Sequence, residues 1–231
     1  DLQRHFNNDL TTLSGGVSFA SDDINPTDAS LFNRVTDESK RTSSAFFSVS
    51  QIIDQNSLFQ SSLNLTHHSG FLTDPYKLGD ARPDSRTQTA LSNAYRRFIP
   101  SLDAAMHLDL RLYDDNFGVN SLTFEVSWYQ NLGDNWQITP SLRYYSQSDA
   151  DFFSTVNDFS GTVPHNSSDY RLAAYGAVSG GLQVQTILDD VTLTFMVERY
   201  VTDDDYSLFD GASSPALVNF TRMSLGVGYS F

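Results

Sequence analysis

Apolar and polar residues alternate along much of the chain, which is the pattern of a β-strand with one apolar and one polar face. In the clearest segment, apolar residues at every second position from 104 to 112 are interleaved with His107, Asp109 and Arg111. The same period of two recurs at 122–129 and at 136–145. The pattern therefore predicts an all-β chain built from amphipathic strands.

Short and long connections alternate between the predicted strands, as in a meander that crosses a slab. The short ones are expected at 7–9, 54–57, 100–103, 133–135 and 188–190, and the long ones at about 22–40, 69–87, 114–118, 146–168 and 202–216. Ten complete strands result, with 169–186 read as one long strand through Gly180 and Gly181. Residues 1–6 are expected to form the lower end of an eleventh strand of a larger barrel that lacks its amino-terminal strands here, or a non-spanning arm.

The alternation does not by itself say what the apolar faces contact. A soluble β-sandwich buries them in a core, whereas a membrane barrel turns them to lipid and its polar faces to an aqueous lumen. The chain ends with apolar residues at every second position as far as Tyr229 and Phe231, and a last strand of this kind resembles the sorting signal of bacterial outer-membrane proteins. We therefore predict an antiparallel up-and-down transmembrane β-barrel, one domain over residues 1–231, in the bacterial outer membrane. Tyr229 and Phe231 are its predicted insertion signal.

Composition removes several classes of function. The chain has 231 residues, and no apolar run is long enough for a transmembrane helix. It lacks cysteine, which excludes disulfides, thiolate metal sites and a cysteine nucleophile. Its 28 acidic residues outnumber 14 basic ones, for a net charge of -14, which argues against a nucleic-acid partner.

Charged residues recur on the predicted polar faces and form a candidate charge network in the lumen. Such charges either select solutes at a constriction or pair with one another and stiffen a barrel filled by its own side chains, and the second interpretation is favoured. The members of the predicted network are His107, Asp109, Arg111, Glu125, Arg143, Arg171, Glu198 and Arg222.

The predicted loops hold acidic clusters at 22–23, 114–115, 149–151 and 203–205. Clustered carboxylates can bind calcium, but the spacing differs from that of helix-loop-helix calcium sites, so we interpret them as solvated loop residues. His67, His68 and His165 lie near loops, and no nucleophile elbow, phosphate loop or HExxH motif is present. We therefore predict a protein that is not an enzyme and has no metal or cofactor.

Distinctive segments are spread over nearly the whole chain. They read SFASDDINP at 18–26, GFLTDPYK at 70–77, RPDSRT at 82–87, LRYYSQSDADFF at 142–153 and SDYRL at 168–172. In these segments the chain resembles a proteobacterial family of outer-membrane proteins catalogued as domain of unknown function 3570. The resemblance implies a barrel of more than ten strands in longer family members. Genes for thioredoxin-like and flavin-transferring proteins often lie beside those of the family, and this arrangement suggests a redox role in the envelope.

The predicted function is a pore or passage for an unidentified solute. One alternative is a non-catalytic barrel that acts as a scaffold or sheath for an envelope partner, and another is a soluble β-sandwich binding module. The expected partners are outer-membrane lipid and lipopolysaccharide, the barrel-assembly machinery through the carboxy-terminal strand, and, in the scaffold alternative, an envelope protein.

Overall fold

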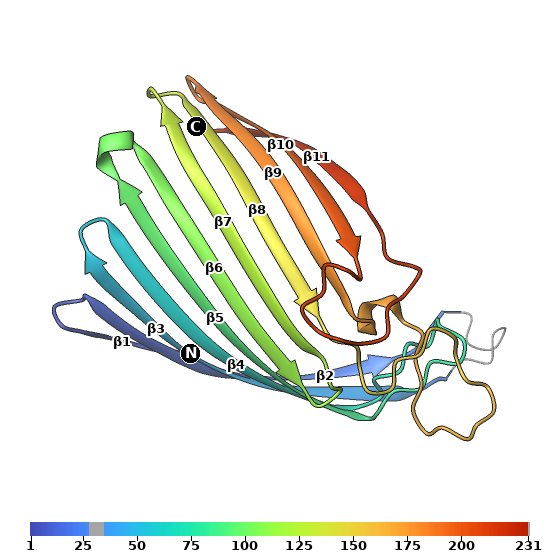
Figure 1. Ribbon diagram of the computed structural model, residues 1–231. Helices are drawn as coiled ribbons and strands as arrows, with labels where there is room; N and C mark the ends of the chain where they lie inside the picture. The colour runs from blue at the N-terminus through green and yellow to red at the C-terminus, as the bar shows by residue number, and fades with distance from the viewer. Residues whose placement is uncertain (28–34, 231) are drawn as a thin grey trace.

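A computed structural model describes residues 1–27 and 35–230, which form one antiparallel sheet of eleven strands (Figure 1). The strands are β1 (Leu2–Phe6), β2 (Thr11–Ile24), β3 (Glu38–Asp54), β4 (Ser57–Gly70), β5 (Ser85–Ile99), β6 (Ala104–Asp115), β7 (Asn120–Leu132), β8 (Trp136–Gln147), β9 (Tyr175–Leu188), β10 (Val191–Asp203) and β11 (Phe220–Tyr229). Two 3-10 turns, η1 (Pro100–Leu102) and η2 (Tyr170–Leu172), lie between strands. No helix in the described ranges is long and apolar enough to cross a membrane.

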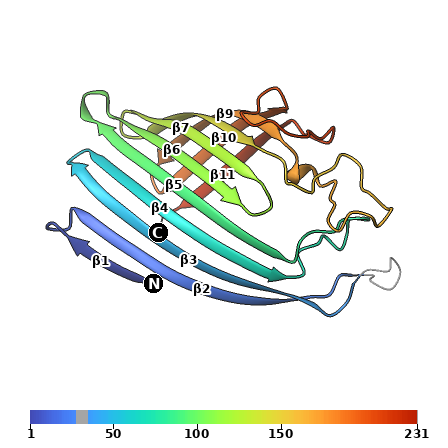
Figure 2. The ribbon, with the colours of Figure 1, turned by 60° about the horizontal axis from the view of Figure 1, so that its bottom comes forward.

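The strands pair strictly in chain order, so the predicted all-β, up-and-down antiparallel arrangement is confirmed. The sheet is strongly curled but does not close, and β1 and β11 are its two edges (Figure 2). The predicted strand in residues 1–6 is confirmed as β1, which pairs with the first residues of β2, from Phe6 opposite Thr11 to Leu2 opposite Gly15.

The long connections lie at one end of the sheet and short ones at the other, with one exception: the long connection expected at 114–118 is a turn of four residues, 116–119, at the end with the long connections. We call the two ends the turn end, which holds residues 7–10, 55–56, 100–103, 133–135 and 189–190, and the loop end, which holds residues 25–27, 35–37, 71–84, 116–119, 148–174 and 204–219. At the turn end, Asn7, Asn8 and Asp9 have φ of 51°, 54° and 67°. Asn and Asp tolerate this left-handed region better than other residues with a side chain, which explains why they occupy the tight turns.

One predicted strand begins later than expected. Residues 169–174 are not part of a strand, because the Asp169 side chain accepts a hydrogen bond from the Arg171 backbone nitrogen (3.1 Å) and η2 follows. The apolar residues Leu172 and Ala174 are in phase with β9 in the sequence, which made them resemble its continuation. The prediction that the strand runs through Gly180 and Gly181 is confirmed, since both lie inside β9.

The register carries one apolar face and one polar face through the whole sheet. Leu142 lies opposite Val126 and Gly180, whereas the next residue, Arg143, lies opposite Glu125 and Ser179. Most exposed apolar side chains in the middle of the strands share the first face, and they include Val17, Phe47, Phe59, Leu63, Leu91, Phe124, Leu142, Leu182, Phe195, Met223, Leu225 and Val227.

The polar face is the crowded side of the sheet. Ser48, Ser127 and Ser179 are buried on it, whereas large apolar side chains on the other face are exposed. Side chains converge on the concave side of a curled sheet, so we identify the polar face with the concave side (Figures 1 and 2). The only cluster of buried hydrophobic residues among those described lies at the loop end.

Candidate functional site

Three connections pack together at the loop end, above the polar face. We call residues 71–84, 116–119 and 148–174 the loop cap (Figure 1). Ala81 and Asn166 exchange two backbone hydrogen bonds of 2.8 Å, which join the β4–β5 connection to the β8–β9 connection. On the polar face, the Gln147 side-chain nitrogen donates to the backbone oxygens of Arg171 (3.0 Å) and Ala173 (2.7 Å). Hydrogen bonds therefore join the connections of the loop cap to one another and to β8 beneath them.

The loop cap has a small apolar core of its own. Phe117, Val119, Ala150 and Leu172 are buried together. The Phe117 ring meets the Phe152 ring edge to face, with centroids 4.9 Å apart and an angle of 83°. Rings of this geometry attract one another because the positive edge of one faces the negative face of the other.

A group of aspartates and arginines holds the two long connections together. The Arg82 guanidinium donates to Asp80 and to Asp169, each at 2.8 Å, and Arg171 donates to Asp169 at 2.5 Å. The Ser167 hydroxyl donates to the other oxygen of Asp80. The side chains of Asp80 and Asp169 are 0% and 3% exposed, so both carboxylates depend on these partners. A buried charge without a partner is strongly destabilising.

Asp169 is held in its charged form. Burial alone raises the pKa of this carboxyl, but hydrogen bonds from the Arg171 side chain and backbone and from Arg82 outweigh it, and the pKa lies well below the usual range of aspartate. Because Asp169 stays ionised, the ion pairs of the loop cap persist in mildly acidic solution.

A third buried carboxylate contradicts the solvated-loop interpretation of one acidic cluster. Asp115, in the predicted acidic cluster at 114–115, is buried, and Arg86 donates to it at 2.8 and 2.5 Å. The hydroxyl of Tyr113 donates to the same oxygen at 2.6 Å, and the backbone nitrogens of Phe117 and Val119 donate to the other at 3.0 and 3.1 Å. Asp115 therefore shapes the 116–119 turn, while Asp114 is exposed as predicted.

The structure divides the predicted charge network into separate groups. Asp109 accepts a hydrogen bond from Arg96 at 2.7 Å, and Glu198 pairs with Arg222 across β10 and β11 at 2.9 Å. Arg171 belongs to the loop cap and not to a strand, so its predicted place on the polar face of the sheet is wrong; the turn that starts at Asp169 removes it from β9.

The remaining members of the predicted network share the polar face without pairing. Asp109, Glu125 and Arg143 follow one another across β6, β7 and β8 in register, and Arg111 lies two residues beyond Asp109. Within the described ranges, Arg111, Glu125 and Arg143 make no ion pair, and both arginines are exposed. His107 packs against Tyr129, with ring centroids 4.3 Å apart.

Aromatic residues beside these arginines were not part of the predicted network. Tyr145 and Tyr175 have ring centroids 5.5 Å apart, and Tyr200 stacks on Phe220 at 4.9 Å with an angle of 25° between the rings. All four residues lie on the polar face, in register with the arginine positions. Among them, Tyr145 could have been located from the sequence, because it lies two residues after Arg143 and therefore shares its face of the strand.

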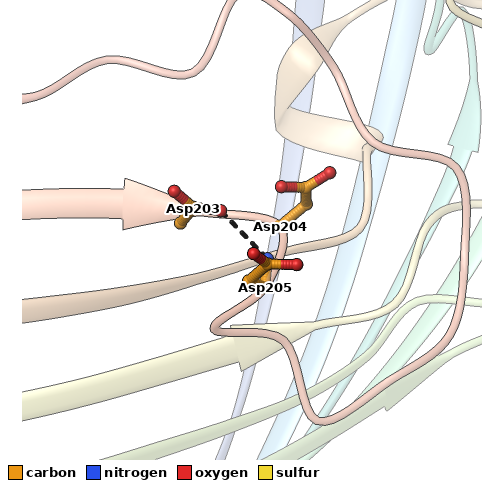
Figure 3. Close-up of side chains that lie close together, drawn as sticks. All are labelled: Asp203, Asp204 and Asp205. Atoms are coloured by element: carbon orange, nitrogen blue, oxygen red, sulfur yellow. Dashed lines mark hydrogen bonds between the residues drawn. The ribbon is translucent and has the colours of Figure 1, made fainter.

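The predicted loop and terminal residues show no built site in the described part of the chain. The carboxylates of Asp203, Asp204 and Asp205 lie within 4.8 Å of one another and are exposed, and the Asp205 backbone nitrogen donates to Asp203 (Figure 3). This arrangement agrees with a solvated loop. Tyr229 ends β11 on the apolar face and is exposed, while Phe231 lies outside the described residues.

Two of the histidines near loops, His67 and His68, contact neutral side chains. His67 contacts the Thr87 hydroxyl at 3.0 Å, and His68 contacts Thr42 at 2.9 Å and Gln88 at 3.0 Å. These contacts fix the rings within the sheet. The absence of catalysis stays a prediction.

Comparison with curated proteins gave no match. A family model described as "Protein of unknown function (DUF3570)" matches residues 1–219 of the 231, which is nearly the whole chain. The resemblance seen in the distinctive segments is thereby confirmed, and the chain belongs to the DUF3570 family.

Proposed function

We propose that this chain forms the wall of an outer-membrane β-barrel whose polar interior is a passage for a solute. The observation that carries the proposal is the distribution of exposed apolar side chains. Phe47, Leu63, Phe124, Leu142 and Phe195 are between 39% and 53% exposed and lie on one face of five different strands. Water disfavours a continuous apolar surface of this extent, whereas a bilayer favours it.

Strand length and hydrogen bonding agree with this environment. β2 to β11 have 10 to 17 residues, and a tilted strand needs about 9–11 to cross a bilayer. Consecutive antiparallel pairing gives every strand from β3 to β10 a hydrogen-bonded neighbour on both sides, as the hydrocarbon core requires, whereas β1 pairs with β2 only from Thr11 to Gly15. Apart from the four-residue β6–β7 turn, the connections are short at one end and long at the other, which matches the two sides of an outer-membrane barrel.

The loop cap favours a second candidate, a closed barrel that supports another envelope protein. Its buried ion pairs and apolar core lie at the loop end on the concave side, where they would narrow the outer mouth. Whether the cap leaves room for a solute distinguishes a passage from a scaffold. No observation favours the soluble β-sandwich, since the described sheet has no second sheet against its apolar face.

The proposal is tested on the native full-length polypeptide extracted from outer membranes. We expect recovery with the outer-membrane fraction, slower or faster gel migration after heating, and stepwise conductance in planar bilayers. A variant with Arg82→Met should increase the conductance, because it loosens the cap. Heat-modifiable migration without conductance in either protein would support the scaffold, and recovery in the aqueous fraction would exclude both membrane proposals.

A further inference from the structure

The polar face carries an arginine–tyrosine patch, which we define as Arg111, Arg143, Tyr145, Tyr175 and Tyr200. We infer that this patch binds a small carboxylate that carries an aromatic ring. The inference rests on the proposed function, because it requires the polar face to contact water inside the barrel.

The arginines are available to an anion. Both are exposed on the polar face and make no ion pair with a described residue, whereas Arg82 and Arg86 bind buried aspartates. Arg111 lies 5.2 Å from the centroid of the Tyr113 ring, which holds its side chain against the sheet without neutralising it. A guanidinium fixed in this way presents a planar pair of donors that matches a carboxylate.

The tyrosines add a surface for a planar ring. The ring centroids of Tyr145 and Tyr175 lie 5.5 Å apart, and the Tyr200 ring stacks on the ring of Phe220. In the register, Tyr200 lies opposite Ser179, which lies opposite Arg143, so a small residue separates the guanidinium from the tyrosine ring. A ring that enters beside Arg143 and passes over Ser179 on β9 therefore meets the aromatic surface of Tyr200 on β10, two strands away.

The patch lies directly beneath the loop cap. The Tyr145 hydroxyl donates to Gln147 at 2.5 Å, and the Gln147 nitrogen holds the backbone of Arg171 and Ala173. The position of the tyrosine ring is thus fixed by the cap. A solute that passed the cap would reach the patch next.

One acidic residue limits the strength of the patch. Glu125 lies opposite Arg143 in the register but forms no ion pair with it within the part of the chain that the structure describes. Its charge repels a bound carboxylate, so Glu125→Gln is expected to strengthen binding. This prediction has the opposite sign to that for an arginine variant, and loss of folding cannot imitate it.

The test is calorimetric titration of the detergent-purified full-length protein with benzoate. We expect benzoate to bind more tightly than cyclohexanecarboxylate, which lacks the aromatic ring, and than benzyl alcohol or inorganic phosphate. Arg143→Gln should weaken benzoate binding about tenfold or more, the loss expected for a charge-assisted hydrogen bond. Tyr200→Leu should remove the preference over cyclohexanecarboxylate. The matched control is Arg199→Gln, because Arg199 is exposed on the opposite face of β10.

Equal affinity for benzoate and cyclohexanecarboxylate would overturn the aromatic part of the inference. Equal effects of Arg143→Gln and Arg199→Gln would overturn the whole of it, as would weaker binding by Glu125→Gln. Heat-modifiable migration confirms the fold of each variant. The titration measures binding independently of conductance. If the protein conducts but does not bind benzoate, the inferred patch is wrong and the proposed passage stands. If it binds benzoate but does not conduct, the passage is wrong and the patch stands.

Discussion

The loop cap and the middle of the sheet are built on opposite principles. In the cap, Phe117 and Leu172 are buried and charged residues are paired, as in a small water-soluble protein. In the middle of the sheet, Leu142 and Phe195 are exposed while serines are buried on the concave side. The chain therefore buries its apolar side chains in the loop cap and exposes them in the middle of the sheet. This difference indicates that the two regions have different surroundings.

The largest expected effect concerns the cap. Arg82→Met leaves Asp80 and Asp169 without their shared partner, and loss of one member of a buried ion pair costs about 3–5 kcal/mol. We expect faster amide hydrogen exchange at Ala81 and Asn166, which hold the cap together. The matched control, Arg97→Met, removes an arginine that is 48% exposed and 3.9 Å from Asp54 at the turn end. Exchange that is equally slow in both variants would show that the ion pairs do not hold the cap.

A smaller effect is expected from Leu142→Arg in the middle of the apolar face. In lipid vesicles an arginine near the bilayer centre of a barrel costs about 2–4 kcal/mol. In water, a change at an exposed position usually costs within about 0.5 kcal/mol. Urea titration followed by heat-modifiable migration measures the difference.

The control for this experiment is Gln183→Arg, on the polar face of the neighbouring strand. It should leave stability nearly unchanged. If both arginines cost the same, the apolar face does not contact lipid, and the contrast between the two regions has another cause.

The smallest effect concerns pH. The folded pKa of Asp169 is lowered, so its contribution to stability is complete above the ordinary aspartate pKa of about 3.9 and is lost as pH falls below that value toward the folded pKa. Hydrogen exchange at Asn166, corrected for its intrinsic pH dependence, should show constant protection from pH 7 to about 4. Protection should then decline, with a shallower slope in Asp169→Asn. A decline in protection that begins near pH 6 would show that the stability of the cap depends on a titrating group other than Asp169.

Periodicity predicted the sheet because every strand repeats the same local rule. The alternation from Ala104 to Leu112 and the Asn and Asp residues of the turns are visible within a few neighbours. The cap depends on contacts that have no local signal. Arg82 and Asp169 are 87 residues apart, and Asp115 was indistinguishable in the sequence from the exposed Asp114 beside it. Part of the candidate patch could be predicted from the sequence. The alternation along their strands assigns Arg111 and Arg143 to the polar face, whereas only the register shows that Tyr175 and Tyr200 lie near them.

The separation of Arg82 and Asp169 also sets an order of events during folding. Hairpins such as β6–β7 close over four residues, so their chain-entropy cost is small. The ion pair between the two long connections closes a far longer loop, and contacts of that range form slowly unless the chain between them is already arranged. Pairing of β5 through β8 brings the two connections together. The cap should therefore be the last part to assemble, and its formation would report that the strands beneath it are in register.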